Sequence, residues 1–252
     1  MEELGYSVIY GDTDSIFVKV DESLTAQCCN KIGNELMTHI NHQWERHIAK
    51  DFNLKSYLEI EFETHYSPFF MPTIRDKKTG SKKRYVGKIV KGDESKIVFK
   101  GMETVRSDWT EFAQEFQKEL FEALFDSQFE IAQLDEIVKD YTKRLFAGEF
   151  DQKLVYKKRL GRNLNDYEKN IPPHVQAVKK HKAEHPDFEV RRGQIIEYVY
   201  AMSGAEIFNG KNALNYPLYQ QRQLVPISAA IFDALVIDNK KNNLGQLFLP
   251  DF

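Results

Sequence analysis

The chain has 252 residues, a formal net charge of −3, and 42% hydrophobic side chains, which suffices for the core of one large domain or two small ones. It contains no apolar run near the roughly 20 residues of a membrane-spanning helix, and its acidic start, Met1-Glu2-Glu3, is unlike a signal peptide. The adjacent Cys28 and Cys29 cannot build a disulfide framework and indicate a reducing compartment.

The charge is unevenly distributed along the chain. Residues 71–100 hold ten basic and three acidic side chains, and residues 151–200 hold eleven basic and seven acidic ones. The overall charge of −3 argues against a generic nucleic-acid binder. Two basic blocks can nevertheless form a phosphate-binding track that the total conceals. For either block alone, a solvated basic loop is the simpler explanation.

The first predicted element is a β-hairpin with carboxylates at its tip. Two short apolar runs, residues 7–10 and 16–18, flank Gly11-Asp12-Thr13-Asp14, and Gly and Asp favour a tight turn. Such a tip can present oxygen ligands to Mg²⁺, which binds through one or two carboxylates plus substrate phosphates. The plainer alternative is a solvated turn, because a short Asp-x-Asp is common.

An EF-hand does not fit this turn. With Asp12 as position 1, positions 5, 6 and 12 are Ile16, Phe17 and Ser23. An EF-hand needs an oxygen ligand, a glycine and a glutamate at those positions.

A long amphipathic helix is predicted next. Apolar residues recur every four positions from Leu24 to Ile48, which indicates about seven turns. Asp21 or Ser23 is expected to cap its start, and the spacing turns Cys28 toward the core.

Strands follow this helix. Residues 58–63 alternate apolar and acidic side chains, which predicts a strand with its apolar residues inward. Residues 84–90 and 96–99 predict two more strands, joined in a hairpin by a turn at 91–94.

From residue 108 the pattern becomes mainly helical. Asp108 and Glu111 have the spacing of a capping box. Further helices are predicted at 131–146 and 216–237, with a strand at 195–200. The predicted fold class is therefore α+β, with an α+β part up to about residue 105 and a mainly helical part after it.

The hexapeptide Tyr10-Gly11-Asp12-Thr13-Asp14-Ser15 resembles, residue for residue, the third palm motif of B-family DNA polymerases. The resemblance extends over essentially the whole chain. The sequence at residues 64–66, 71–75 and 104–106 is most similar to the bacterial enzymes of this family. It implies that residues 1–105 are the C-terminal part of the palm, 106–240 the thumb and 241–252 a tail. Asp14 would be the main metal ligand with Asp12 beside it, in a two-Mg²⁺ site completed by an upstream aspartate that this sequence lacks.

A second motif carries the resemblance. Lys82-Lys83-Arg84-Tyr85 matches the motif with which the family contacts primer–template DNA near the primer end. As a bare pattern it is weak, because basic tetrapeptides are common. The family also has a Glu-x-Glu pair near the metals, which implies an auxiliary metal role for Glu63. A solvent-facing acidic stripe is the alternative.

The thumb resemblance rests on the second basic block. Lys100-Gly101-Met102-Glu103 resembles the passage from palm to thumb, and the basic segment that begins at Val155 resembles the part that grips duplex phosphates without reading sequence. The implied DNA contacts are Lys157, Lys158, Arg159 and Arg162.

The last residues resemble the bacterial sliding-clamp peptide Gln-Leu-x-Leu-Phe. The implied clamp contacts are Gln246, Leu247, Leu249 and Phe252, although Pro250 stands where the phenylalanine is expected. The alternative is a hydrophobic tail docked on its own domain.

Two family motifs that complete the active site, Asp-x-x-Ser-Leu-Tyr-Pro and Asn-Ser-x-Tyr-Gly, do not occur in this sequence. We therefore expect the C-terminal part of a larger bacterial, cytoplasmic and nucleoid-associated enzyme that adds nucleotides from a dNTP to a primer 3′-hydroxyl. The alternatives are a non-catalytic module that binds DNA and the clamp, and a translated remnant of a disrupted gene.

Overall fold

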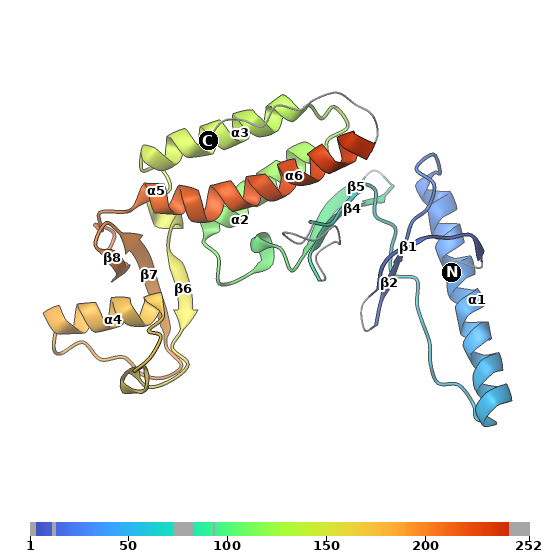
Figure 1. Ribbon diagram of the computed structural model, residues 1–252, viewed down its shortest axis with the longest axis horizontal. Coiled ribbons are helices and arrows are strands. Elements are labelled where there is room, and N and C mark those ends of the chain that lie inside the picture. The colour runs from blue at the N-terminus through green and yellow to red at the C-terminus, as the bar shows by residue number, and fades with distance from the viewer. Residues whose placement is uncertain (1–3, 12–13, 73–82, 93, 242–252) are drawn as a thin grey trace. The chain divides into compact units, whose positions relative to one another are not determined.

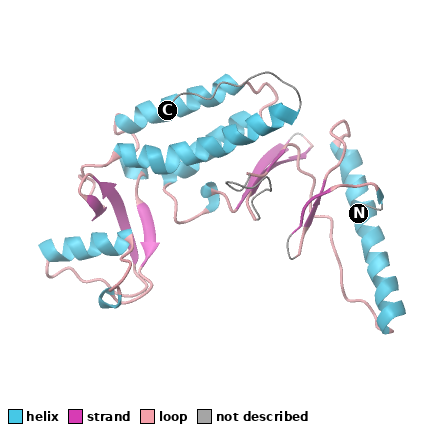
Figure 2. Cartoon of the chain, viewed as in Figure 1, coloured by secondary structure: helices cyan, strands magenta, loops and turns pink. Residues whose placement is uncertain are grey.

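The computed structural model divides into two compact units, Met1–Val98 and Phe99–Phe252 (Figure 1). It describes residues 4–11, 14–72, 83–92 and 94–241, with side chains described as far as 236. Helices and strands occur together (Figure 2), which confirms the α+β fold class. Within the described part, no helix combines the length and apolar character needed to cross a membrane.

The first unit begins with the predicted acidic hairpin. Strands β1 (Val8–Gly11) and β2 (Ile16–Val18) pair antiparallel, with Tyr10 opposite Phe17 and Gly11 opposite Ile16. A second sheet has the strand order β3-β4-β5. Its strands are β3 (Phe69–Phe70), β4 (Tyr85–Lys91) and β5 (Glu94–Lys100), so the strand pair predicted at 84–99 is also confirmed.

The long helix α1 (Ala26–Phe52) forms as predicted, but its cap and its buried face differ from the prediction. Thr25 is the N-cap, and its hydroxyl accepts a hydrogen bond from the Cys28 amide. Asp21 instead accepts from the amide and hydroxyl of Ser23, so both predicted caps are wrong.

The helical phase of the two cysteines was also predicted wrongly. Cys28 is exposed and Cys29 is buried, the reverse of the prediction. Four residues advance a helix by about 400°, because each residue adds about 100°. A row of apolar residues at four-residue spacing therefore drifts around the helix, and the buried face is set by Cys29 and Leu36, seven residues apart.

The strand predicted at residues 58–63 is wrong. The segment joins none of the described sheets. The Asn41 side chain instead takes the place of a neighbouring strand: its amide nitrogen donates to the Ile60 carbonyl, and its oxygen accepts from the Ile60 amide, both at 2.9 Å. Phe62 lies so close to Gly33 of α1 that a Cβ there would be 2.3 Å from its ring.

The second unit joins a helical group to a small sheet. Helix α2 contacts both α3 and α6, while α4 packs on β7 and β8 of a sheet with the order β6-β7-β8 (Figure 1). Both strand pairs of this sheet are antiparallel. The elements are α2 (Glu111–Leu124), α3 (Ile131–Phe146), β6 (Tyr156–Arg159), α4 (Pro173–Glu184), β7 (Ile195–Ala201), β8 (Gly204–Ile207), α5 (Tyr216–Tyr219), a π-helical segment (Gln220–Leu224) and α6 (Val225–Lys241), with 3-10 turns at Glu103–Val105, Asp151–Lys153 and Leu164–Asp166.

The predicted helix at 131–146 and the strand at 195–200 are confirmed, whereas the helix predicted at 216–237 is divided by its π-helical segment. The capping box at Asp108 is wrong. Thr110 caps α2 by accepting from the Ala113 amide, and Asp108 accepts two hydrogen bonds from Arg106.

Candidate functional site

The acidic hairpin presents one described carboxylate. Asp14 is exposed and lies in the turn that leads from β1 to β2. Asp12, the other predicted metal ligand, lies outside the described residues. Gly11 and Ile16 pair at the adjacent ends of β1 and β2.

An aromatic cluster joins the hairpin to the second sheet of the same unit. The Phe17 ring lies 5.8 Å from Tyr10, 5.3 Å from Phe69 and 5.1 Å from Tyr85, measured between ring centroids. Tyr66 completes the cluster, and burial raises the pKa of its hydroxyl, so the hydroxyl stays neutral at physiological pH. These contacts hold β1, β2, β3 and the start of β4 in one packed group.

A hydrogen bond links the two sequence motifs directly. The backbone amide of Lys83 donates to the Tyr10 hydroxyl at 3.2 Å. Lys83 has a φ of 68°, a left-handed conformation that is uncommon for a residue with a side chain. The sequence patterns did not predict this role of Tyr10, although the residue directly precedes the acidic turn in the sequence.

The predicted primer-end motif is only partly described. Lys83 is exposed, Arg84 is half-buried, and the Tyr85 ring packs within the aromatic cluster. Lys82 lies outside the described residues.

The described residues do not complete a metal site. Among them, no three His, Cys, Asp or Glu side chains are grouped so that they could hold an ion. Glu63 is exposed, as is Asp14. Asp14 supplies a hard oxygen donor suited to Mg²⁺, but a two-metal centre needs further carboxylates.

The second unit carries the predicted thumb cations on strand β6. Lys157 lies opposite Glu197 and forms an ion pair of 3.2 Å with it. Lys158 is 4.0 Å from Asp108, and Arg159 ends the strand. All three are exposed, as is Arg162 just beyond the strand. Four exposed cations therefore lie within six residues, where phosphates can reach them.

A buried histidine of α4 packs against β7 of the sheet that contains this strand. His174 is only 7% exposed and lies in ring contact with Tyr167 and Tyr198. Burial, and to a smaller extent the charge of Lys158, lower its pKa. His174 is therefore neutral at physiological pH and acts in packing.

The segment 100–103, which resembles the passage from palm to thumb, is held on α2 by hydrogen bonds. Glu103 is buried and accepts a hydrogen bond of 2.7 Å from the Gln117 amide. The Gln117 oxygen accepts from both the amide and the hydroxyl of Thr104. One buried side chain thus ties the short helical turn Glu103–Val105 to the core of the second unit.

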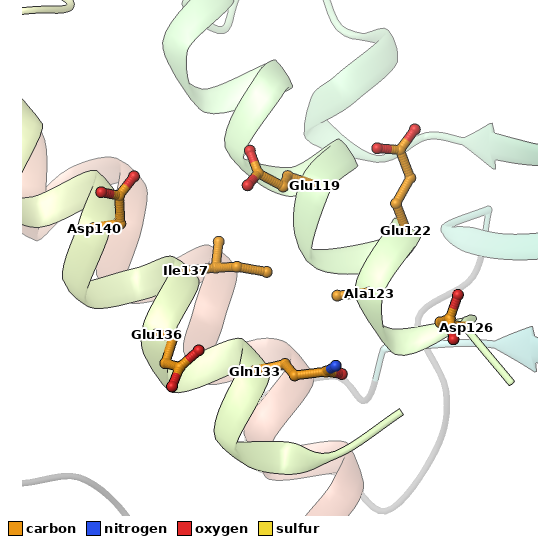
Figure 3. A pocket seen from close by; sticks show the side chains of 8 residues that line it. All are labelled: Glu119, Glu122, Ala123, Asp126, Gln133, Glu136, Ile137 and Asp140. Carbon is orange, nitrogen blue, oxygen red and sulfur yellow. The ribbon is translucent and has the colours of Figure 1, made fainter. Parts of the chain in front are cut away.

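An open hollow of about 460 Å³ lies between α2 and α3 (Figure 3). Its lining has no basic residue and contains five carboxylates: Glu119, Glu122, Asp126, Glu136 and Asp140. These negative charges repel phosphates, so the hollow is not a nucleic-acid site.

Comparison with known proteins identifies the family. The sequence profile described as DNA polymerase family B matches residues 1–240. The chain is 44% identical to "DNA polymerase II" of Escherichia coli, over 99% of this chain and 32% of that protein. It is 32% identical to "DNA polymerase" of Thermococcus gorgonarius, over 82% of this chain and 23% of that protein.

A solved structure shares the fold. The family B DNA polymerase of Pyrobaculum calidifontis superposes with a TM-score of 0.57 at 23% identity, over 91% of this chain and 27% of that one. The chain therefore spans about a third or less of the length of these relatives. The predicted resemblance is confirmed: the chain belongs to DNA polymerase family B.

Proposed function

We propose that this chain is the C-terminal palm and thumb portion of a DNA-directed DNA polymerase. The reaction is template-directed transfer of a nucleotide from a dNTP to a primer 3′-hydroxyl. The observation that carries the proposal is the acidic hairpin with its Tyr10–Lys83 hydrogen bond, in a chain 44% identical to a DNA polymerase over almost its whole length. Residues 1–105 would form the palm portion, 106–240 the thumb and 241–252 the tail.

In this proposal the first unit serves the reacting end of the primer. Asp14, together with Asp12, would supply carboxylate oxygens to Mg²⁺, and Lys83 and Tyr85 would lie nearest the primer terminus. When bound, two such ions stabilise the attacking and leaving oxygens of nucleotidyl transfer. Because the described residues do not complete that centre, the remaining carboxylates would come from other parts of the polymerase.

The second unit would hold the duplex. Lys157, Lys158, Arg159 and Arg162 are exposed and closely spaced, which favours contact with successive phosphates rather than with bases. The ion pair of Lys157 with Glu197 is exposed on both sides, so exchanging the carboxylate for a phosphate costs little.

Two features of the proposal concern partners and location. The tail residues Gln246, Leu247, Leu249 and Phe252, which lie outside the described part, would bind a sliding clamp. The relative from Escherichia coli favours a bacterial protein that works in the cytoplasm at the nucleoid.

Primer extension by the complete polymerase that contains this chain tests the catalytic assignment. Asp14→Asn removes one negative metal ligand while keeping the side-chain size. We expect extension to fall by about 100-fold or more. Glu22→Gln is the matched control, because Glu22 is exposed and pairs only weakly with Lys19. Unchanged extension by Asp14→Asn would overturn the assignment.

A second candidate function is a non-catalytic module that binds DNA and the clamp. It is favoured by the second unit, which has its own core and carries the basic strand, and by the incomplete metal site of the described residues. Duplex binding by this chain that ignores both Mg²⁺ and Asp14, together with no extension by the complete protein, would support it.

A further inference from the structure

The strand that carries the thumb cations is held at its first residue. Tyr156 begins β6, directly before Lys157. Its ring stacks on Tyr198 at 5.3 Å and lies 6.1 Å from Tyr219, with interplanar angles of 19° and 22°. Burial raises the pKa of Tyr156 to about 12, so its hydroxyl is neutral and available for hydrogen bonding.

The partner of this hydroxyl is a buried amide. The side-chain nitrogen of Gln223 donates to the Tyr156 oxygen at 2.5 Å. The Gln223 oxygen accepts from the Thr110 hydroxyl at 2.6 Å, and neither Gln223 nor Thr110 has measurable exposure. Thr110 is the N-cap of α2. One glutamine thus connects the start of the basic strand to the start of a core helix.

The backbone around Gln223 is unusual. It lies in the π-helical segment Gln220–Leu224, between α5 and α6. A π-helical turn holds one more residue than an α-helical turn, and such turns are frequent at functional sites. Because each residue of a regular α-helix advances by about 100°, the π-helical segment changes the helical phase between α5 and α6.

A second residue of the same helical stretch holds the chain just before β6 begins. The Tyr219 hydroxyl donates to the Leu154 carbonyl at 2.8 Å and accepts from the Tyr200 amide of β7 at 2.9 Å. Arg222 lies over the Tyr200 ring at 4.7 Å. Leu154 and Tyr156 are therefore both fixed by the helix, and the exposed cations follow immediately.

The same network passes close to a cation contact. Thr110 is two residues from Asp108, which lies 4.0 Å from Lys158. The chain of hydrogen bonds from Thr110 through Gln223 to Tyr156 thus runs beside the contact between Asp108 and Lys158. Both connect the start of α2 to β6.

We propose that Gln223 is a positioning residue for duplex binding, which rests on the proposed function of β6. It contacts no DNA itself. It holds the backbone of β6 so that Lys157, Lys158 and Arg159 present their charges at a fixed spacing before DNA arrives. Preorganisation of this kind lowers the cost of ordering a binding surface.

The test measures the affinity of this chain for a fluorescently labelled DNA duplex, by anisotropy, over a series of salt concentrations without Mg²⁺. Gln223→Leu and Tyr156→Phe each break the bond between them, and Tyr156→Phe keeps the stacked ring. We expect each to weaken binding by about 3- to 10-fold. The double variant should bind DNA no more weakly than the single variant with the larger loss of affinity, because the two residues act as a pair.

The salt dependence separates positioning from direct contact. Its slope follows the number of phosphates neutralised, so Gln223→Leu should leave the slope unchanged. Lys158→Ala should lower it by about one unit for one lost contact.

Ser228→Ala is the matched control for stability. Ser228 is also buried, but its hydroxyl donates to the Leu224 and Val225 carbonyls of the same helical stretch and not to β6. It should lower the melting temperature and leave the affinity unchanged.

The outcomes distinguish the inference from the proposed function. If Lys158→Ala weakens binding while Tyr156→Phe and Gln223→Leu bind like the parent chain, Gln223 is only structural and the inference is wrong. The inference is also wrong if the loss of DNA affinity in each variant, Ser228→Ala included, is proportional to its loss of melting temperature. If the parent chain shows no salt-dependent binding, the proposed function of β6 and the inference both fail.

Discussion

The Lys83 amide donates a hydrogen bond of 3.2 Å to the Tyr10 hydroxyl, from 73 residues further along the chain. This bond joins the strand that leads into the acidic turn to Lys83, which lies two residues before β4. The two motifs that identify the family are therefore physically connected within the first unit. Tyr10 also contacts Phe17, so its ring and its hydroxyl fix different neighbours.

Tyr10→Phe tests this connection. The ring contacts remain, but the Lys83 amide loses its acceptor, which we expect to cost about 1 kcal/mol locally. Hydrogen exchange at the Lys83 amide should become faster, and primer extension by the complete polymerase should slow. Tyr6→Phe is the control, because Tyr6 lies outside the aromatic cluster. Unchanged exchange at Lys83 in Tyr10→Phe would contradict the role of this bond.

Glu206 should make the second unit sensitive to acid. Hydrogen bonds from Lys180, Ser203 and Asn212 lower its pKa from 4.5 to about 2. Because the folded-state pKa is lowered, the stabilisation is complete above pH 4.5 and is lost as the pH falls from 4.5 toward 2. Glu206→Gln should therefore reduce the free energy of unfolding at pH 7 by about 1 to 2 kcal/mol, after allowance for solvent screening.

Denaturant unfolding of both proteins across this pH range measures the effect. The difference between the parent chain and Glu206→Gln should shrink below pH 4.5. A difference that stays constant from pH 7 to pH 2 would show that the Glu206 charge does not contribute.

Gly33→Ala should destabilise the first unit, against the usual trend. In an exposed helix this change stabilises by about 1 kcal/mol. Here the new Cβ would lie 2.3 Å from the Phe62 ring, so the ring must move and the net result should be a loss of about 1 kcal/mol. The double variant Gly33→Ala with Phe62→Leu should recover part of this loss in thermal unfolding. If Gly33→Ala alone raises the melting temperature, Phe62 does not pack there.

The two cysteines should differ in their reaction with a thiol reagent. Cys28 is exposed, whereas Cys29 is only 3% exposed and burial raises its pKa, which disfavours the reactive thiolate. We expect one fast-reacting thiol in the native chain and two after denaturation. Cys28→Ser should remove the fast phase, and a fast phase that persists in this variant would contradict the placement of Cys29.

Local sequence patterns were sufficient where short-range chemistry decides the structure. The hairpin around Asp14 follows from two apolar runs and turn-forming residues, and helix α3 follows from its apolar spacing. The motifs predicted the family for the same reason, since they are contiguous in sequence. The roles of individual site residues such as Lys83 and Glu63 remain predictions.

Errors arose where a distant partner decided the structure. Residues 58–63 alternate like a strand, but Asn41 bonds the amide and carbonyl of Ile60, and no described strand pairs with the segment. Thr110 displaces Asp108 as a cap, because Arg106 holds the Asp108 carboxylate.

By itself, the sequence determined the family, the acidic turn, the basic segment that begins at Val155 and most of the helices and strands, because each depends on neighbours within a few residues. Only the tertiary structure decided that Tyr10 reaches Lys83 and that Gln223 reaches Tyr156. These bonds join residues 73 and 67 positions apart, and Gln223 of the second bond lies in a π-helical segment. Hydrogen bonds of this kind depend on how separate elements pack, and no local pattern encodes that packing.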